Sequence, residues 1–477
     1  MDLSGIHIYQ WSQIIDLLNS KILWGPPALM LLLGTHLFLT FKLRFIQRYI
    51  FKGIKLSFTK NKSGQRGDIN PFAALATALS STLGTGNIIG VGTAIALGGP
   101  GAVFWCWLTG IFAIATTYSE ALLAVKFRVR TTDGTMLGGP MYTLERGLKM
   151  RSTAILFAFF TALAALGIGN SIQANSVASI LSQNYRIPCS ATGLVMATIT
   201  CLVIFGGIKS ISKLCTKLVP LMALFYICGC LLLLYINSAY LLKAIALIVQ
   251  SAFSPMAGGG GFIGSNIMLA ARFGIARGLF TNEAGMGSAA IVAAAAKTPN
   301  APRQALIAAT ATFWDTVVIC ALTGIVLVAA ILANPALSAD PANPLCLSGA
   351  QLTNAVFAQI PYVGQAILSI GLVTFAFSTI LGWSYYGEKA VQYLAGERSI
   401  PAYRSVWVAA VFCGSVMNLE LLWHIADSLN ILMAIPNLFS LLLLNKLIVK
   451  DTNTYLRSNQ LDLQDPTPIP KIYTKKF

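Results

Sequence analysis

Charged side chains are scarce in this sequence, and their scarcity argues against a soluble protein. Asp, Glu, Lys and Arg make up only 10% of the 477 residues, whereas 56% are hydrophobic. Soluble domains usually carry about 25% charged residues. Apolar stretches of about 20 residues, the length that crosses a bilayer as a helix, recur along the chain. The composition therefore predicts a single all-α polytopic membrane protein surrounded by the lipid bilayer.

Patterns typical of catalysis and metal binding are also missing from the sequence. Its three histidines, His7, His36 and His424, show no metal-ligand spacing, and no CxxC pair is present. No nucleophile has an evident base beside it, which argues against a membrane enzyme. The sequence also lacks a ring-forming filter motif, which argues against a passive channel. We expect neither a cofactor nor an obligate protein partner.

Hydropathy predicts about eleven transmembrane helices, the first of which precedes a strongly basic stretch at 42–66. The predicted spans are 22–41, 70–97, 101–125, 153–182, 192–208, 214–236, 244–271, 304–333, 363–387, 405–421 and 427–445. Basic loops stay in the cytoplasm under the positive-inside rule. An odd number of crossings therefore places the N-terminus outside and the C-terminus inside.

The net charge of +17 follows from this topology rather than from nucleic acid binding, which basic clusters can also indicate. Only Lys21, Arg186 and Lys243 fall in segments predicted outside, and every other Lys and Arg falls in a predicted cytoplasmic segment. A missing or extra span would destroy this imbalance. We expect a multi-pass protein of the plasma membrane, of the bacterial cytoplasmic type, with no nucleic acid partner.

Most of the nine cysteines fall within predicted helices, where they act as small apolar packing residues. Cys189 and Cys346 are exceptions, because both fall in loops predicted outside. A disulfide between them is chemically possible in that compartment.

Two glycine-rich interruptions point to the binding site. One lies at 83–87, in the first of the ten later helices, and the other at 258–261, in the sixth. A helix in lipid is interrupted only where the break faces protein or a watery cavity. Breaks at the same rank in two sets of five helices predict an inverted repeat with its site at the midplane. Glycines that merely permit close helix packing are the plainer alternative.

This interpretation divides the chain into four parts. They are an N-terminal helix with a basic linker (1–69), a first five-helix repeat (70–240), a second five-helix repeat (241–450) and a cytoplasmic tail (451–477).

Four sequence blocks resemble the alanine or glycine:cation symporter family. They are 78–88 (ALSSTLGTGNI), 98–105 (GGPGAVFW), 138–142 (GGPMY) and 277–288 (RGLFTNEAGMGS). The resemblance covers nearly the whole chain beyond the first helix. It departs from the family pattern at Ser80, Ser81 and Cys106. It implies a LeuT-type fold, with one peripheral helix and a 5+5 inverted repeat, and import of a small neutral amino acid with sodium.

The breaks offer groups suited to an amino-acid zwitterion. Freed amides around Gly84, Thr85 and Gly86 can hold a carboxylate as a helix N-terminus does. The ammonium can be accepted by freed carbonyls or by the amide oxygen of Gln173, to which the family resemblance assigns a substrate role. An interhelical hydrogen bond is the alternative for Gln173. The remaining candidates are the carbonyls of Gly258, Gly259, Gly260 and Gly261, and an apolar wall of Phe262 and Trp383.

Sodium prefers several oxygen ligands, which carbonyls and hydroxyls can supply without a fixed anion. In the first break these are the carbonyl near Leu83 and the side chains of Thr85 and Asn87. On the eighth core helix they are Thr374, Ser378 and Thr379. The resemblance implies a sodium site between these two helices. Bonds from the hydroxyls to their own helix carbonyls are the alternative.

Three acidic residues are functional suspects because a charge in the membrane is costly. Glu120 and Asp315 occupy equivalent helices of the two repeats. Glu120 lies six residues before Lys126, so we expect it in a structural ion pair near the inner interface. Asp315 lies deeper, with either a packing role or a gate or proton role. Glu283, in a predicted cytoplasmic turn, is expected to cap or gate.

The leading hypothesis is a secondary active symporter of alanine or glycine with sodium. A proton-coupled carrier, or an exchanger of another small solute on the same fold, is the nearest alternative. Neither broken helix holds a midplane carboxylate, which disfavours protons, but Asp315 keeps that alternative open.

Overall fold

The computed structural model describes residues 23, 25–59, 65–254, 267–337, 347, 349–417 and 420–472. The second glycine break (Gly258, Gly259, Gly260, Gly261), Phe262 and Cys346 lie outside the described residues. Their predicted roles, including the disulfide with Cys189, stay predictions.

Long apolar helices dominate the described chain. Six are long and apolar enough to cross a membrane: Gly101–Lys126, Arg151–Tyr185, Gly207–Ile236, Ala301–Ala333, Gly364–Ala395 and Ile425–Leu443. Two bent helix pairs raise this to eight, and two shorter apolar helices are Cys189–Ile204 and Ser238–Phe253. Described helices lie within each of the eleven predicted spans, so the polytopic α-helical class is confirmed, while the number of crossings stays a prediction.

The helices are bounded as follows. The first half of the chain contains α2 (Pro26–Lys42), α3 (Ile50–Ser57), α4 (Pro71–Thr82), α5 (Val91–Gly98), α6 (Gly101–Lys126), α7 (Pro140–Tyr142), α8 (Arg151–Leu166), α9 (Ile172–Tyr185), α10 (Cys189–Ile204) and α11 (Gly207–Ile236). The second half contains α12 (Leu241–Phe253), α13 (Ile267–Asn282), α14 (Ser288–Ala293), α15 (Ala301–Thr312), α16 (Ala321–Ala333), α17 (Gly349–Phe357), α18 (Gly364–Ala395), α19 (Ile400–Val416), α20 (Glu420–Leu443) and α21 (Asn445–Asp451).

The first predicted break is confirmed. Helix α4 begins at Pro71, where the side chain of Asn70 accepts a hydrogen bond from the Ala73 amide at 2.7 Å. It ends at Thr82, and the chain resumes at Gly86 as a π-helical turn that leads into α5. The two halves meet at 52°. Leu83 has left the helical conformation, with ψ at 89°, so the backbone between the halves is free to bind other groups.

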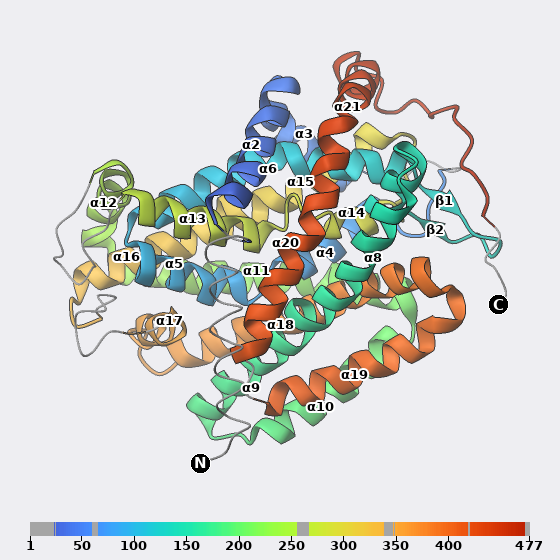
Figure 1. The fold of residues 1–477 in the computed structure, drawn as a ribbon. Coiled ribbons are helices and arrows are strands. Elements are labelled where there is room, and N and C mark those ends of the chain that lie inside the picture. Colours follow the sequence, from blue (N-terminus) through green and yellow to red (C-terminus); the bar gives the residue numbers. More distant parts are fainter. Residues whose placement is uncertain are drawn as a thin grey trace.

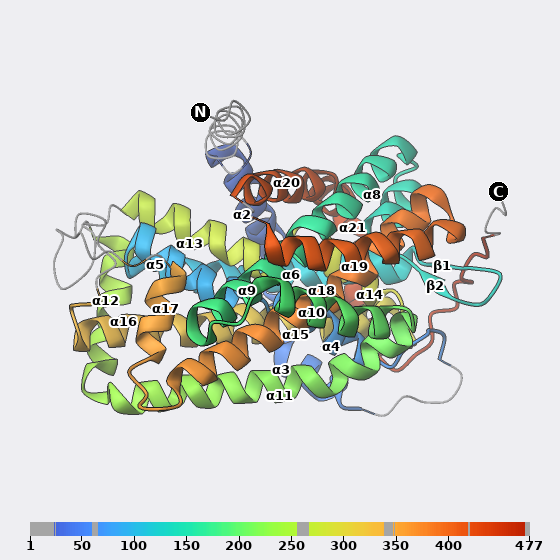
Figure 2. The same ribbon diagram turned by 90° about the horizontal axis from the view of Figure 1, so that it is seen from below.

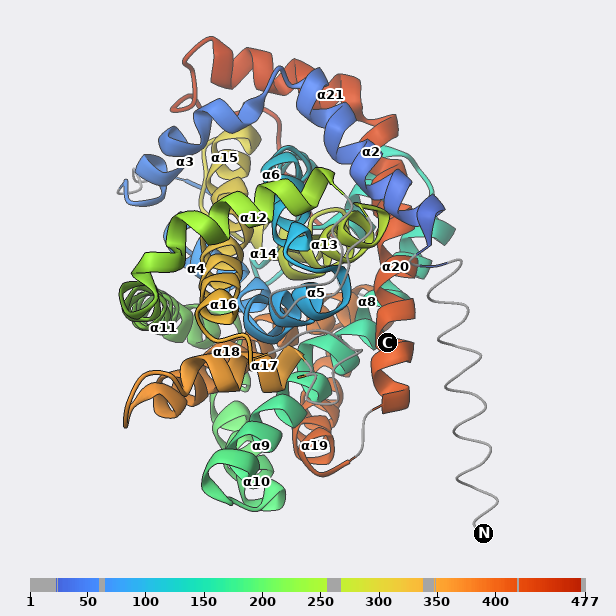
Figure 3. The same ribbon diagram turned by 90° about the vertical axis from the view of Figure 1, so that its left-hand side faces the viewer.

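The helices form two packed groups with α4 between them. The α6 group comprises α6, α12, α13 and α15, and the α18 group comprises α8, α9, α10, α18 and α19. Helix α4 packs against both α15 and α18 (Figures 1 and 3). Helix α2 lies against α6, and α20 lies against α8. The broken helix is therefore enclosed by helices from both groups.

Most long helices run between two ends of the molecule, which differ in character (Figures 1 and 2). One end, called here the basic face, carries the short strands β1 (Val129–Arg130) and β2 (Met136–Leu137), together with the end of the tail. These strands pair antiparallel. The other end carries α12 and α17. The β1–β2 hairpin belongs to segment 126–151, which was predicted to be cytoplasmic.

Cysteine labelling in intact cells tests this orientation. Asp133 lies in the exposed β1–β2 turn, and Tyr362 is fully exposed between α17 and α18 at the other end. We expect Asp133→Cys to react only with a membrane-permeant thiol reagent and Tyr362→Cys to react with an impermeant one as well. The parent protein controls for native cysteines. Labelling of both positions by the impermeant reagent would contradict the predicted topology.

Candidate functional site

The backbone at the first break is held by side chains from the same helix and from a neighbouring helix. The Gly84 amide donates to Asn87 Oδ1 at 2.9 Å, and the Thr85 amide donates to Gln173 Oε1 at 3.3 Å. Gln173 also donates through Nε2 to the Ile168 carbonyl at 3.1 Å. The structure therefore brings Gln173 to the break, as the sequence predicted, but as an acceptor for a freed amide.

Helix α18 supplies hydroxyls to the carbonyls of α4. Ser378 Oγ donates to the Ser80 carbonyl at 3.2 Å, and Thr379 Oγ1 donates to the Leu83 carbonyl at 3.2 Å. Both hydroxyls also contact the Phe375 carbonyl, at 2.8 and 3.1 Å. Five oxygens from two helices therefore gather beside the break. Leu83, Ser378 and Thr379 were predicted here, whereas the Ser80 and Phe375 carbonyls were missed because backbone oxygens leave no mark in a sequence.

Thr374 does not belong to this cluster. Its hydroxyl bonds to the Ile370 and Gly371 carbonyls of its own helix at 2.7 and 3.0 Å. Its side chain lines an apolar pocket together with residues of α9 and α10. The structure therefore does not bring Thr374 to the carbonyls that Ser378 contacts, although residues four apart lie on one face of a helix.

The Thr85 hydroxyl is the unpaired polar group of the break. The side chain is only 2% exposed, and its Oγ1 has no hydrogen-bond partner. A buried hydroxyl without a partner is costly, so such groups often mark a site for a ligand. Gly84 lies beside it, and a Cβ there would sit 2.7 Å from Thr379 Oγ1 and 3.3 Å from Gln173 Oε1. Only glycine fits between these two polar side chains.

Asn87 connects the break to a buried carboxylate. Its Nδ2 donates to Asp315 Oδ1 at 2.6 Å, while its Oδ1 accepts from the Gly84 amide. Thr316 Oγ1 bonds the other carboxylate oxygen at 2.6 Å. Asp315 is completely buried, and both of its carboxyl oxygens have hydrogen-bond partners. Asp315 therefore holds the Asn87 side chain in place, and this side chain connects it to the break.

Trp383 lies between Glu283 and the backbone at Gly169. Its Nε1 donates to Glu283 Oε1 at 2.8 Å, and Ser288 Oγ donates to Glu283 Oε2 at 2.5 Å. A Cβ at Gly169 would lie 2.3 Å from the Trp383 side chain, so the indole packs directly on the α8–α9 backbone. Glu283 is buried and adopts a left-handed conformation, with φ at 55°. It fixes the tryptophan rather than standing in an exposed turn.

The contacts of Glu120 differ from those predicted. The expected ion pair near the inner interface is wrong, because Glu120 Oε1 accepts from the Gly285 amide at 2.9 Å and from Asn437 Nδ2 at 2.6 Å. Lys126 instead pairs with Asp451 and Asp465. Glu120 thus joins α6, the 283–287 turn and α20. Sequence spacing pointed to the nearest cation along the chain, whereas the fold supplies neutral donors from distant segments.

Comparison with known proteins now decides the family. A family model described as the sodium:alanine symporter family matches residues 8–468. The chain belongs to the sodium:alanine symporter family. Its relatives include the sodium/alanine symporter AgcS of Methanococcus maripaludis, 48% identical over 94% of this chain and 98% of the relative. A probable sodium/glutamine symporter, GlnT of Bacillus subtilis, is 34% identical over 94% of this chain and 91% of the relative.

Solved structures support the fold of this symporter. MhsT in complex with L-phenylalanine superposes with a TM-score of 0.53, at 14% identity, over 85% of this chain and 94% of that one. A mutant manganese transporter of Eremococcus coleocola gives a TM-score of 0.52, at 14% identity, over 86% of each chain. Both are transporters with the LeuT-type fold that the sequence predicted. The protein is a multi-pass membrane transporter for cation-coupled amino-acid symport, not an enzyme.

Removing the Glu283 side chain tests its contact with the indole. Glu283→Ala leaves the buried Trp383 N–H without its acceptor, which costs roughly 1 to 3 kcal/mol. We expect the purified protein to unfold at a temperature several degrees lower. Glu397→Ala, in the loop after α18, is the control. Equal unfolding temperatures for the two variants would show that the Trp383–Glu283 bond does not stabilise the fold.

Proposed function

We propose that this symporter imports a small neutral amino acid, alanine or glycine, together with sodium by alternating access. The observation that supports this most is the break between α4 and α5, where freed backbone groups face polar side chains of α9 and α18. We place two five-helix repeats at 70–240 and 241–450, between the N-terminal segment 1–69 and the tail 451–477. The N-terminus lies outside and the C-terminus inside, in a bacterial cytoplasmic membrane.

The five-oxygen cluster suits sodium. Three carbonyls and two hydroxyls provide neutral oxygen ligands, which a hard cation prefers. The hydroxyl-to-carbonyl distances of 2.8 to 3.2 Å bring these atoms together from two helices. With sodium bound, the hydroxyl hydrogens would turn away and the lone pairs would face the ion. We assign this role to Leu83, Ser378, Thr379 and the two added carbonyls, and not to Thr374.

The substrate groups belong to the same opened stretch of backbone. The Gly84, Thr85 and Gly86 amides suit the carboxylate, and the unpaired Thr85 hydroxyl is a further donor next to them. Gln173 can exchange its bond to the Thr85 amide for a bond to the substrate. Trp383 packed on Gly169 leaves little volume, which favours a short side chain. The second break and Phe262 would complete the site.

The oxygen cluster favours sodium over protons as the coupled ion, because it contains no group that takes up a proton. Asn87 and Thr316 bond the two oxygens of Asp315, which holds this carboxyl in place behind the break. Asp315 is the group of this region that a proton-coupled alternative would use. A proton-coupled carrier would need the carboxylate to gain and lose a proton in each cycle. Uptake driven by a proton gradient in the absence of sodium would favour that alternative.

Paired threonine variants on α18 test the sodium site. Thr379→Val removes a hydroxyl of the cluster, whereas Thr374→Val removes one that bonds only its own helix. We expect Thr379→Val to weaken the sodium dependence of alanine binding by about one to two decades and Thr374→Val to change it little. Alanine binding to purified protein at several sodium concentrations gives the comparison. If the two variants behave alike, sodium does not bind at this cluster.

Trp383 variants test size selection. Trp383→Ala opens volume beside Gly169, so longer neutral amino acids should compete for uptake while alanine binds less tightly, because it loses contact surface. Trp383→Phe keeps a ring and is the matched variant. Competition of unlabelled amino acids against labelled alanine gives the profile. If Trp383→Ala has the same competition profile as the parent protein, the Trp383 side chain serves only in packing.

A further inference from the structure

The last described segment of the chain, 459–472, begins with turns, then crosses the basic face as an irregular segment, and is called here the C-terminal strap. Figure 1 shows it running from the α21 region to the β1–β2 hairpin. Pro466, Pro468 and Pro470 alternate with other residues in it. Proline fixes φ and lacks an N–H, so such a segment loses little entropy when it is held extended. The strap is therefore suited to bind along a surface.

The first half of the strap binds the start of α15. The side chain of Asn300 donates to the Leu461 and Leu463 carbonyls at 2.9 and 2.8 Å. The Asp465 amide donates to the Pro299 carbonyl at 2.9 Å. Arg303 forms an ion pair with Asp462. Three backbone groups and one charge of the strap are thus bound to one helix end of the α6 group.

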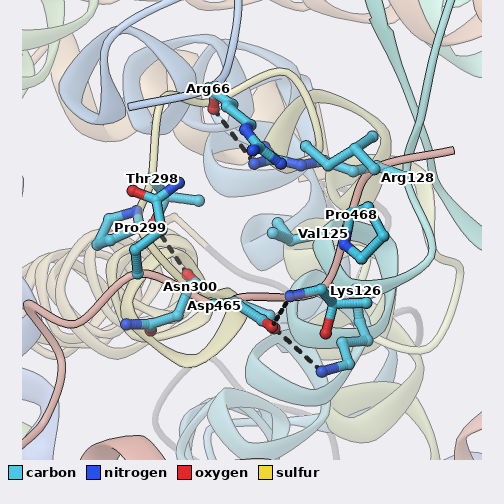
Figure 4. A pocket seen from close by; sticks show the side chains of 13 residues that line it. Arg66, Val125, Lys126, Arg128, Thr298, Pro299, Asn300, Asp465 and Pro468 are labelled. Carbon is cyan, nitrogen blue, oxygen red and sulfur yellow. Dashed lines mark hydrogen bonds and ion pairs between the residues drawn. The ribbon is translucent and has the colours of Figure 1, made fainter. Parts of the chain in front are cut away.

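Asp465 inserts into a small pocket at the end of α6 (Figure 4). Its Oδ2 lies 3.0 Å from Lys126 Nζ. Partial burial alone would raise the pKa of the Asp465 carboxyl, but hydrogen bonds from Thr467 and Lys126 outweigh burial and lower it. The carboxyl is therefore charged at neutral pH. Lys126 also pairs with Asp451, at 3.0 Å, so one ammonium joins the strap to the end of α21.

The same pocket also contains Arg128, which binds the segment that precedes the broken helix. Arg128 Nη1 donates to the Ala296 carbonyl at 2.9 Å, and its Nη2 donates to the Arg66 carbonyl at 3.2 Å. Burial lowers the Arg128 pKa to about 10, which leaves the guanidinium charged at neutral pH. The chain before α4 also pairs with this segment, because the Lys297 amide donates to the Ile69 carbonyl at 2.8 Å. The strap therefore covers the junction at which α4 begins.

The second half of the strap reaches the other helix group. The Arg130 amide donates to the Pro470 carbonyl, and the Ile472 amide donates to the Arg130 carbonyl, both at 2.9 Å. These bonds add the strap to the edge of β1. Ile472 then lines a cavity of about 480 Å³ together with Tyr142 of α7 and with Gln392 and Tyr393 of α18. One extended segment thus contacts both the α6 group and the α18 group.

We propose that the C-terminal strap holds the basic-face ends of the two helix groups together and that its end at Ile472 must leave the cavity beside α7 and α18 before the site opens toward that face. The proposal rests on the proposed alternating access, in which these ends separate. Opening would pull the end of α6, the start of α15 and β1 away from α7 and α18, and the strap contacts both sides of that gap. Its own sequence thereby sets how readily the transporter opens inward.

A reversible cross-link tests the release. Ile472 of the strap and Ala395 of α18 line the same cavity, so cysteines at these two positions can be joined by a short bifunctional methanethiosulfonate reagent. In vesicles with a sodium gradient, we expect the cross-linked Ile472→Cys/Ala395→Cys protein to lose alanine uptake and to regain it on reduction, while the treated parent protein is unaffected. Full uptake by the cross-linked protein would falsify the proposal. Failure to cross-link would contradict the contact between the strap and α18 on which it rests.

Loosening the strap should have the opposite effect. Asp462→Asn/Asp465→Asn removes both of its ion pairs while keeping the side-chain size. We expect faster hydrogen exchange at the 465 and 472 amides and about two- to fivefold faster uptake, the change expected from losing one or two partly exposed ion pairs. Asp133→Asn is the control, because the side chain of Asp133 accepts hydrogen bonds from Thr131 and Thr135 of its own loop. Equal rates in the two proteins would overturn the proposal.

Binding measurements separate this proposal from the proposed function. Sodium-dependent alanine binding to the solubilised cross-linked protein should stay within about twofold of the reduced form, because the strap contacts no residue of the break. Binding that persists while uptake stops identifies a block of opening. Absence of sodium-dependent binding in the parent protein would instead contradict the proposed symport, whatever the strap does.

Discussion

The fold depends on one constraint: the backbone opened at 83–87 is buried and must have its polar groups paired. Inside a membrane protein, an unpaired amide or carbonyl costs several kcal/mol, so a helix breaks only where other segments supply partners. Here Gln173 of α9 and Thr379 of α18 bind this backbone from outside its own helix. Each contact also fixes the position of the helix that provides it. The site and the packing of the bundle are therefore one arrangement.

The three buried acidic residues are likewise paired with groups from distant segments of the chain. Asp315, Glu283 and Glu120 each accept hydrogen bonds from neutral groups that belong to other segments of the chain. A buried carboxyl group bound in this way holds its partners in place, because breaking either bond would leave a buried polar group unpaired. Through Asn87 and Trp383, two of the three determine how side chains next to the break are held. The third ties the turn at 283–287 to α6 and α20.

Much of this architecture could be predicted from the sequence, and the exceptions share a cause. Hydropathy located the helices, and glycines with freed polar neighbours located the first break. Family resemblance placed Gln173, Ser378 and Thr379 near it. Thr374 and Glu120 were misplaced because spacing along one helix cannot say which neighbouring helix a face meets. The Ser80 and Phe375 carbonyls, and the contact of Gly169 with Trp383, arise only when distant segments are folded together.

Asn87 illustrates how narrowly such a site restricts evolution. Its amide uses both ends at once, with the oxygen toward the Gly84 amide and the nitrogen toward Asp315. Aspartate has the same shape but would place a second negative charge against the first. Leucine has similar bulk but would leave an amide and a carboxylate unpaired, and glutamine is one methylene too long for a buried position with 0% exposure. None of these three replacements pairs both groups, so a single side-chain amide links the opened backbone to Asp315.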